Sequence, residues 1–207
     1  MINFDAVIRG FAPQARLLLK ESKETDARAL SAIQNQTAPN RDDREQAIRG
    51  WLREYGVFQG IGGPKRNAIA SAIVTWADTR NLQLDLATAD ALDMAHSELV
   101  RVCACGGERG FTSLASKALW LCYPRSVPIF DGFVQRALWM ISKLEKDIVS
   151  LPEAKSDYGK FVHIWKALYD RYSGTLEAID LGDYPYRVRI FDKILWLIGK
   201  PGYGLES

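Results

Sequence analysis

Apolar residues recur along most of this chain at spacings of three and four, which is typical of helices that bury one face. No stretch alternates apolar and polar residues beside a hairpin turn, and no internal repeat occurs. The predicted helices cover residues 13–22, 26–33, 41–55, 64–77, 90–104, 112–124, 132–149, 156–172 and 187–198. The sequence therefore predicts an all-α, compact helical fold of roughly eight to ten helices. We expect a single domain over residues 1–207 that can divide into lobes of about 1–105 and 106–207, with the site between them.

Several predicted helices begin at recognisable capping residues. Pro13 begins a short helix, and Thr25 or Asp26 caps a second one. Asn40 caps a third helix, whose first turn holds acidic residues that favour the positive end of the helix dipole. Pro64 is suited to the first turn of the next helix, because it lacks the amide hydrogen that would be unpaired there.

The stretch from Thr112 to Val134 is apolar but carries two isolated ionisable groups. Lys117 is the single charge from Thr112 through Pro124, and Asp131 is the single charge from Ser126 through Gln135. An ionisable group in such surroundings needs a structural or a chemical reason. This stretch is therefore the first place to look for a functional site.

Lys117 lies on a predicted helix that is apolar almost all round, which predicts burial. Its neighbours at helical spacing are Leu114, Trp120 and Leu121. Desolvation lowers the pKa of an amine and favours its neutral, nucleophilic form. A lysine in such a helix can also extend its ammonium to the rim, which would make it structural.

Asp131 follows Pro128-Ile129-Phe130 and begins the next apolar-periodic segment. An aspartate in front of a helix commonly accepts a backbone N–H as an N-cap. A carboxylate at the same place can also stabilise a developing cation. Because Lys117 and Asp131 lie at two buried helix ends joined by a short link with prolines, the pair predicts a site.

One segment carries a motif: Ser116-Lys117, an aromatic and aliphatic run to Pro124, then Pro128-Ile129-Phe130-Asp131 and Val134. It resembles the catalytic segment of the helix-hairpin-helix DNA glycosylase superfamily, and is most similar to the small bacterial branch with an 8-oxoguanine-glycosylase-like fold. The resemblance covers about twenty-five residues. Two features depart from the family pattern. Gly110 to Ser116 replaces the usual glycine-rich hairpin, and the spacing of 14 residues from lysine to aspartate is shorter.

The resemblance implies a DNA glycosylase that flips a nucleotide out of the duplex. Lys117 would attack the sugar C1′ and form a Schiff base, and Asp131 would stabilise the cationic sugar. The Schiff base also permits strand cleavage. The implied substrate is an oxidised purine in DNA repair, and the alternative is a hypermodified phage base in phage defence. The residues near enough in sequence to line the base pocket are Trp120, Cys122, Phe130 and Trp139. This chemistry requires no metal or organic cofactor.

A second glycine-rich turn, Gly60-Ile61-Gly62, precedes the helix that begins near Pro64. It resembles a hairpin whose backbone amides hold a DNA phosphate, although such a turn is often only a connection. The DNA-contacting residues predicted here are Gly60, Gly62, Lys65 and Arg66. The alternative hairpin runs from Gly106 to Ser116 and offers Arg109 and Ser116. Lys65 is also a rival nucleophile, with Asp78 or Asp85 as its partner.

The remaining composition narrows the class of protein. The net charge is +2, so a DNA-binding protein of this composition must concentrate its positive charge on one face. Cys103, Cys105 and Cys122 show no paired spacing, which argues against a disulfide framework, a zinc site or a four-cysteine iron–sulfur cluster and favours a reducing cytosol. His96 and His163 have no second histidine or carboxylate at metal-ligand spacing, and we interpret both as structural.

These features predict a cytoplasmic bacterial protein that acts as a monomer on double-stranded DNA, with no membrane partner. The chain begins without a signal-peptide design, and it has no apolar run near the roughly 20 residues that span a bilayer. The competing interpretation is a non-catalytic helical module that binds nucleic acid or another protein. In that case Lys117 extends its ammonium to solvent and Asp131 is only a cap.

Overall fold

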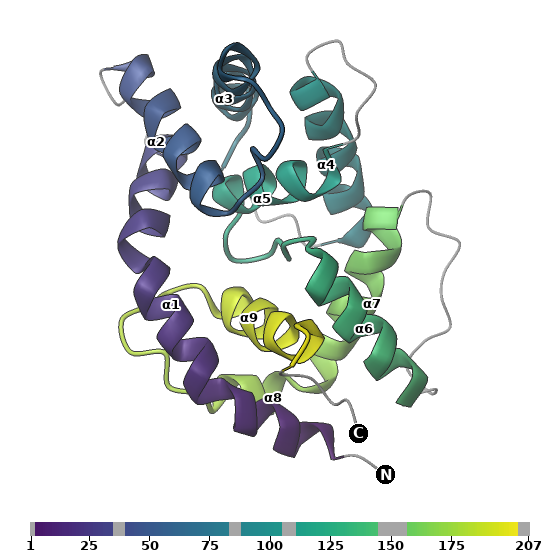
Figure 1. Ribbon diagram of the computed structural model, residues 1–207. Helices are drawn as coiled ribbons and strands as arrows, with labels where there is room; N and C mark the ends of the chain where they lie inside the picture. The colour runs from purple at the N-terminus through teal and green to yellow at the C-terminus, as the bar shows by residue number, and fades with distance from the viewer. Residues whose placement is uncertain (1–2, 35–39, 83–87, 105–110, 145–156, 203–207) are drawn as a thin grey trace. The chain divides into compact units, whose positions relative to one another are not determined.

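The computed structural model describes residues 3–34, 40–82, 88–104, 111–144 and 157–202. These residues form nine α-helices and no β-strand, which confirms the predicted all-α class (Figure 1). The helices are α1 (Phe4–Gln34), α2 (Arg41–Glu54), α3 (Gly63–Asp78), α4 (Ala89–Ala104), α5 (Thr112–Cys122), α6 (Gly132–Leu144), α7 (Asp157–Arg171), α8 (Ser173–Glu177) and α9 (Arg187–Gly199).

The chain forms two compact units. The middle unit is Lys23–Val127, and the terminal unit joins Met1–Ser22 to Pro128–Ser207. The lobe boundary predicted near residue 105 differs from this division. Because α5 packs against α4, it stays with the helices that precede it. The first part of α1 instead packs with the C-terminal helices, a pairing that no local pattern in the sequence indicates.

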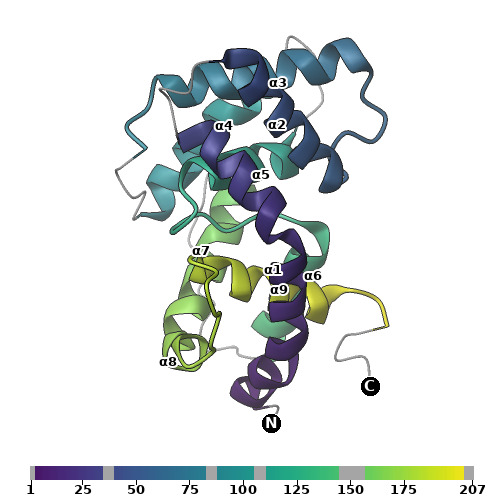
Figure 2. The same cartoon turned by 90° about the vertical axis from the view of Figure 1, so that its left-hand side faces the viewer.

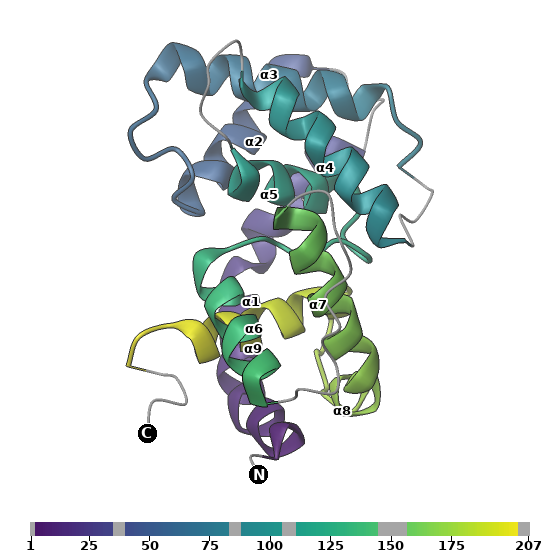
Figure 3. The same cartoon turned by 90° about the vertical axis from the view of Figure 1, so that its right-hand side faces the viewer.

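In the middle unit, α5 packs against α4, α4 against α3 and α3 against α2 (Figures 1 and 3). Every residue of α5 from Leu114 through Cys122 is buried, which confirms the prediction from its apolar sequence. The large side chains of α2, α3 and α5 that are fully buried include Ile48, Trp51, Leu52, Ile69, Ile73 and Trp120.

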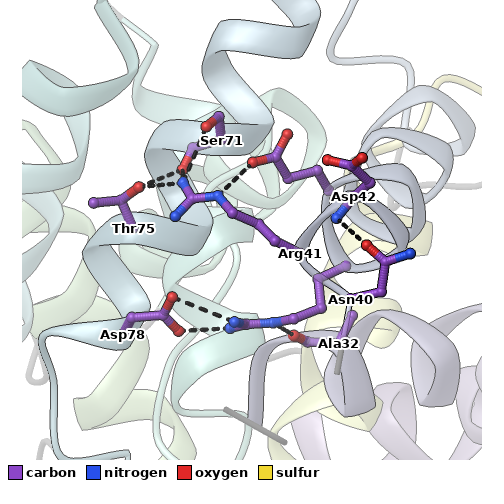
Figure 4. A network of polar contacts seen from close by, with 9 residues as sticks. Ala32, Asn40, Arg41, Asp42, Ser71, Thr75 and Asp78 are labelled. Atoms are coloured by element: carbon purple, nitrogen blue, oxygen red, sulfur yellow. Dashed lines mark hydrogen bonds and ion pairs between the residues drawn. The ribbon is translucent and has the colours of Figure 1, made fainter. Parts of the chain in front are cut away.

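A buried arginine ties three helices of the middle unit together (Figure 4). Arg44 on α2 donates from Nε to the Ala32 carbonyl on α1, at 2.7 Å. Its two terminal nitrogens donate to the Asp78 carboxylate on α3, at 2.6 and 3.3 Å. Only 6% of Arg44 is exposed, so this charge needs its acceptors. On the neighbouring surface, Arg41 donates to Ser71 and Thr75 of α3 (Figure 4).

In the terminal unit, α9 packs closely against α6, and α7 lies beside α6 (Figure 3). The short α8 follows α7 after a single residue, where the sequence predicted only a stop (Figure 2). The closest approach is at Gly199, near the end of α9. A Cβ atom added there would lie 1.8 Å from the carbonyl oxygen of Phe133 on α6. Glycine is therefore required at this crossing.

The prediction of two short N-terminal helices is wrong, because α1 is one continuous helix with Pro13 inside it. Proline removes one backbone hydrogen bond, but the apolar stripe of the helix continues through this position and is buried. Asp26 is accordingly not a cap but a buried residue in the middle of α1. Its carboxylate accepts hydrogen bonds from the indole of Trp51, at 2.7 Å, and the hydroxyl of Tyr55, at 3.1 Å.

Candidate active site

Lys117 lies in the middle of α5 and only 3% of it is exposed. Its ammonium nitrogen donates to the hydroxyl of Ser113, one turn earlier on the same helix, at 2.6 Å. The predicted burial of this lysine is therefore confirmed. The Ser113 hydroxyl fixes the direction of the amine without neutralising it, because a hydroxyl carries no charge.

The start of α5 is held by a buried histidine. His96 on α4 donates from Nε2 to the carbonyl oxygen of Thr112, at 2.9 Å. Burial lowers the pKa of His96, against smaller opposing effects of this hydrogen bond and of Asp93. The neutral ring with its proton on Nε2 matches the acceptor that it faces. This contact agrees with the structural role predicted for His96.

Asp131 immediately precedes α6 and is half-buried. Its Oδ1 accepts a hydrogen bond from the backbone amide of Phe133, at 2.9 Å, which is an N-cap geometry. Among the residues that the structure describes, none donates a hydrogen bond to the other carboxylate oxygen, Oδ2. The carboxylate therefore has one oxygen engaged in the cap and one available for a ligand.

The turn before Asp131 is fixed by a buried carboxylate that sequence reasoning missed. Asp192 on α9 accepts from the backbone amide of Ile129, at 3.1 Å, and from the indole of Trp165, at 2.9 Å. It also pairs with Arg189, at 3.4 Å. The Tyr158 hydroxyl donates to the Pro128 carbonyl, at 3.1 Å, so the carbonyl and the amide of the Pro128–Ile129 peptide group are both held.

The buried surroundings of Asp192 disfavour the charged form of its carboxyl group. Burial raises the pKa of its carboxyl group to about 6, although Arg189 and the hydrogen bonds from Ile129 and Trp165 act in the opposite direction. The one sequence signal that could have pointed to it is an acid and a base three residues apart, Arg189 and Asp192, in a mainly apolar helix. That pattern alone does not reveal the distant turn that Asp192 holds.

Lys117 and Asp131 belong to different units, Lys117 to the middle unit and Asp131 to the terminal unit. Lys117 is on a buried helix and Asp131 is at the start of the next, as predicted, but Lys117 lies in the middle of α5 and not at a helix end.

The four predicted pocket residues have different surroundings. Trp120 and Cys122 are fully buried, and Trp120 stacks on Trp51 within the middle unit, with ring centroids 5.7 Å apart. This packing places both residues in the core rather than in a base pocket. Burial also raises the pKa of the Cys122 thiol far above its ordinary value, so the thiol is inert. Phe130 packs edge-on against Phe161, whereas Trp139 is 59% exposed on α6.

The turn between α2 and α3 contains both glycines of the predicted hairpin. Gly60 has a φ of 73°, a conformation that favours glycine, and Gly62 is the N-cap of α3 without a side-chain cap. The first-turn amides of a helix lack intrahelical partners, so they can bind an anion. Arg66 supports this turn from inside by donating to the carbonyls of Ile61, at 2.6 Å, and Phe58, at 3.4 Å.

Lys65 lies far from Asp78, one of its two predicted partners. Its ammonium lies over the ring of Phe111, 5.4 Å from the centroid. Asp78 is at the other end of α3, about 20 Å away at the usual rise per residue, and is bound by Arg44. The pairing of Lys65 with Asp78 is therefore wrong. Asp85, the other proposed partner, lies outside the described residues.

The alternative hairpin is only partly described. Arg109 and Cys105 lie outside the described residues. Ser116 is fully buried, and its hydroxyl donates to the Ser113 carbonyl, at 2.9 Å. This side chain is consequently engaged in its own helix and does not face solvent as the predicted DNA contact requires.

The described residues also bear on metal binding and on membrane insertion. No group of three or more histidine, cysteine or acidic side chains among them is placed to hold a metal ion. None of the described helices is both long enough and apolar enough to cross a membrane.

Comparisons with known proteins found no relatives. No known protein family, curated protein or solved structure matches the chain.

Proposed function

We propose that this protein is a DNA glycosylase that excises a damaged or modified base by attack of Lys117 on the sugar C1′. The observation that carries the proposal is the state of Lys117. It is a buried amine in an apolar helix, oriented by the Ser113 hydroxyl at 2.6 Å. Burial disfavours the ammonium form of an amine, and a neutral amine is the nucleophile that such a reaction requires.

The reaction follows from these groups. The lone pair of the neutral amine forms a bond to C1′ while the glycosidic C1′–N bond breaks. The bonding electrons leave with the base, which takes up a proton. The lysine nitrogen loses its proton, the sugar ring opens, and a Schiff base results. Water then hydrolyses the Schiff base and restores the lysine, or elimination at the sugar cleaves the strand.

Asp131 stabilises the positive charge that develops on the sugar. Its Oδ1 is fixed by the amide of Phe133, and the turn before it is fixed by Asp192 and Tyr158. Such preorganisation is valuable because the carboxylate need not reorient during the reaction. The proposal requires that bound DNA bring the sugar within reach of both Lys117 and Asp131.

The decisive test is trapping of the covalent intermediate. Borohydride added during turnover should reduce the Schiff base to a stable amine and leave DNA attached to Lys117, identified by peptide mass spectrometry. The substrates should be duplexes that each contain one oxidised purine or one hypermodified cytosine. Lys117→Ala should abolish the cross-link, since the nucleophile is gone, while binding to the same duplex remains.

Lys65→Ala is the matched control and should cross-link like the unaltered protein. A cross-link that maps to Lys65, or that survives in Lys117→Ala, would contradict the assignment of the nucleophile. Absence of any cross-link and of any base release across the whole panel of duplexes would contradict the glycosylase proposal itself.

A non-catalytic helical module that binds nucleic acid is the second candidate. The capping geometry of Asp131 favours it, because that geometry gives the residue a sufficient structural role. The two candidates differ in one measurement. If the protein is a binding module, Lys117→Ala should bind nucleic acid as the unaltered protein does and neither should release a base. If it is a glycosylase, the unaltered protein should release the base and Lys117→Ala should not.

A further inference from the structure

A polar pocket of about 740 Å³ lies among α1, α2 and α3 of the middle unit (the helices are labelled in Figure 1). Its charged lining residues are Arg28, Arg49, Arg53, Arg66, Asp43 and Glu54. Four arginines against two carboxylates leave two positive charges. Arg66 is the only one of these six that the sequence analysis named as a candidate binding residue. The six residues come from three helices and meet only in the folded protein.

The arginine charges are not neutralised inside the pocket. Across the residues that the structure describes, no ion pair joins any of the four arginines to Asp43 or Glu54. Arg49 donates to the amide oxygen of Asn67, which has no charge. Arg28 and Arg53 are exposed, and their guanidinium groups have no hydrogen-bond partner among the described residues. The pocket therefore has a surplus of unmatched hydrogen-bond donors.

Two glycines line the pocket at positions where a larger side chain has room. Gly50 and Gly63 both line it, and a Cβ added at either position would meet nothing within 4 Å. Gly50 lies inside α2, where glycine is normally unfavourable by about 1 kcal/mol relative to alanine. Gly63 is the first residue of α3, so the amides at the positive end of that helix lie at the pocket wall.

We propose that this pocket binds phosphate groups carrying about two negative charges. Guanidinium groups and the amides of a helix start both favour phosphate oxygens. Two sources match this charge: two successive phosphodiesters of a DNA strand, or the phosphomonoester of a nucleotide. The strand source rests on the proposed function and extends it, because it places a DNA-binding surface on α1 and α2. The nucleotide source is independent of that function.

The test uses the full chain and two probes. Adenosine monophosphate, with adenosine and succinate as controls, is titrated by isothermal calorimetry in the absence of DNA. A fluorescent duplex is titrated at several salt concentrations. In the strand case, Arg28→Gln with Arg53→Gln should weaken duplex binding about tenfold for each arginine. The slope of log affinity against log salt should fall by about 1.8. In the nucleotide case, the same variant should lose binding of adenosine monophosphate.

A second variant tests the pocket without changing charge. The leucine of Gly50→Leu fills the free space and favours the helix, so the protein should still fold. It should no longer bind the phosphate probe whose binding Arg28→Gln with Arg53→Gln weakens. Gly10→Leu is its matched control, since that glycine is also helical and also has nothing within 4 Å of an added Cβ. Arg9→Gln with Arg101→Gln is the control for charge, because both arginines are exposed and lie outside the pocket.

The proposal is overturned if the pocket variants bind both probes as well as their controls do, or if succinate binds as well as the phosphate probes. It is supported if one probe depends on Arg28, Arg53 and Gly50 and not on the control positions. Borohydride trapping at Lys117 reports separately on the proposed function. If no DNA is trapped on Lys117 but the pocket binds phosphate, the glycosylase proposal is contradicted and the pocket proposal stands. If DNA is trapped on Lys117 but the pocket does not bind phosphate, only the pocket proposal is contradicted.

Discussion

At the scale of single residues, the two proposed catalytic groups, Lys117 and Asp131, differ in burial and in the hydrogen bonds that they make. Lys117 is buried and donates a hydrogen bond to the neutral hydroxyl of Ser113 on its own helix. Asp131 is half-buried and caps α6 with one of its two oxygens. A cap needs an oxygen acceptor but not a negative charge. The structural and chemical roles of Asp131 can therefore be separated by substitution.

Asp131→Asn should separate them. Asparagine caps a helix nearly as well as aspartate, so the free energy of unfolding should fall by no more than roughly 1 kcal/mol. Loss of the negative charge facing the sugar cation should lower the rate of base release by about 10²–10³. Urea unfolding and single-turnover base release measure the two effects. If the variant unfolds readily while its remaining folded fraction keeps the full rate, the carboxylate serves only as a cap.

At the scale of helices, the start of α6 depends on its contact with α9. Asp192 holds the turn before α6, and Gly199 allows the two backbones to approach. An added Cβ at Gly199 would also lie 2.7 Å from the carbonyl carbon of Phe133 and 3.1 Å from the amide nitrogen of Ala137. These atoms are backbone and cannot rotate away. The position of Asp131 is thus coupled to the packing of α9.

Gly199→Ala should destabilise the protein by about 1–3 kcal/mol or more, because α9 must move away from α6. Gly50→Ala is the control, since an added Cβ there meets nothing within 4 Å and alanine favours a helix. The control should raise the free energy of unfolding by about 0.5–1 kcal/mol. Thermal and urea unfolding of both variants would measure this contrast. Equal stability of the two variants would mean that the close approach of α9 and α6 is absent in solution.

At the scale of the whole molecule, stability should depend on pH through two buried groups with opposite effects. Burial lowers the pKa of His96 below its ordinary 6.5, so the unfolded chain binds this proton more readily and stability is lost as the pH falls below about 6.5. Burial raises the pKa of Asp192 from 3.8 to about 6, so the folded protein binds that proton more readily. Stability from Asp192 is gained as the pH falls from about 6 toward 3.8.

His96→Gln should leave Asp192 as the main buried group that changes the free energy of unfolding with pH in this range. Glutamine can still donate a hydrogen bond to the Thr112 carbonyl but does not titrate. Between pH 6.5 and 5, the free energy of unfolding of His96→Gln should increase more on acidification than that of the unaltered protein. Urea unfolding at a series of pH values measures both profiles. Parallel profiles over this interval would show that His96 is not a neutral, buried group.

The sequence by itself determined the helical class, most helix boundaries and the burial of α5. Each of these follows from local information. Apolar spacing defines the buried face of a helix, and residues such as Asn40, which caps α2 as predicted, define where a helix begins. The same local logic placed Lys117 in the interior and Asp131 at a helix start, before any contact between distant residues was known.

Only the tertiary structure decided which distant residues meet. Asp192 holds an amide 63 positions away, and Arg44 bridges segments of three different helices. The arginines of the pocket also come from three helices. Such contacts depend on how whole helices pack. The spacing of residues within one helix does not indicate which other helix it packs against. The same reason explains why Pro13 does not end α1, since long-range burial of the apolar stripe outweighs the loss of one local hydrogen bond.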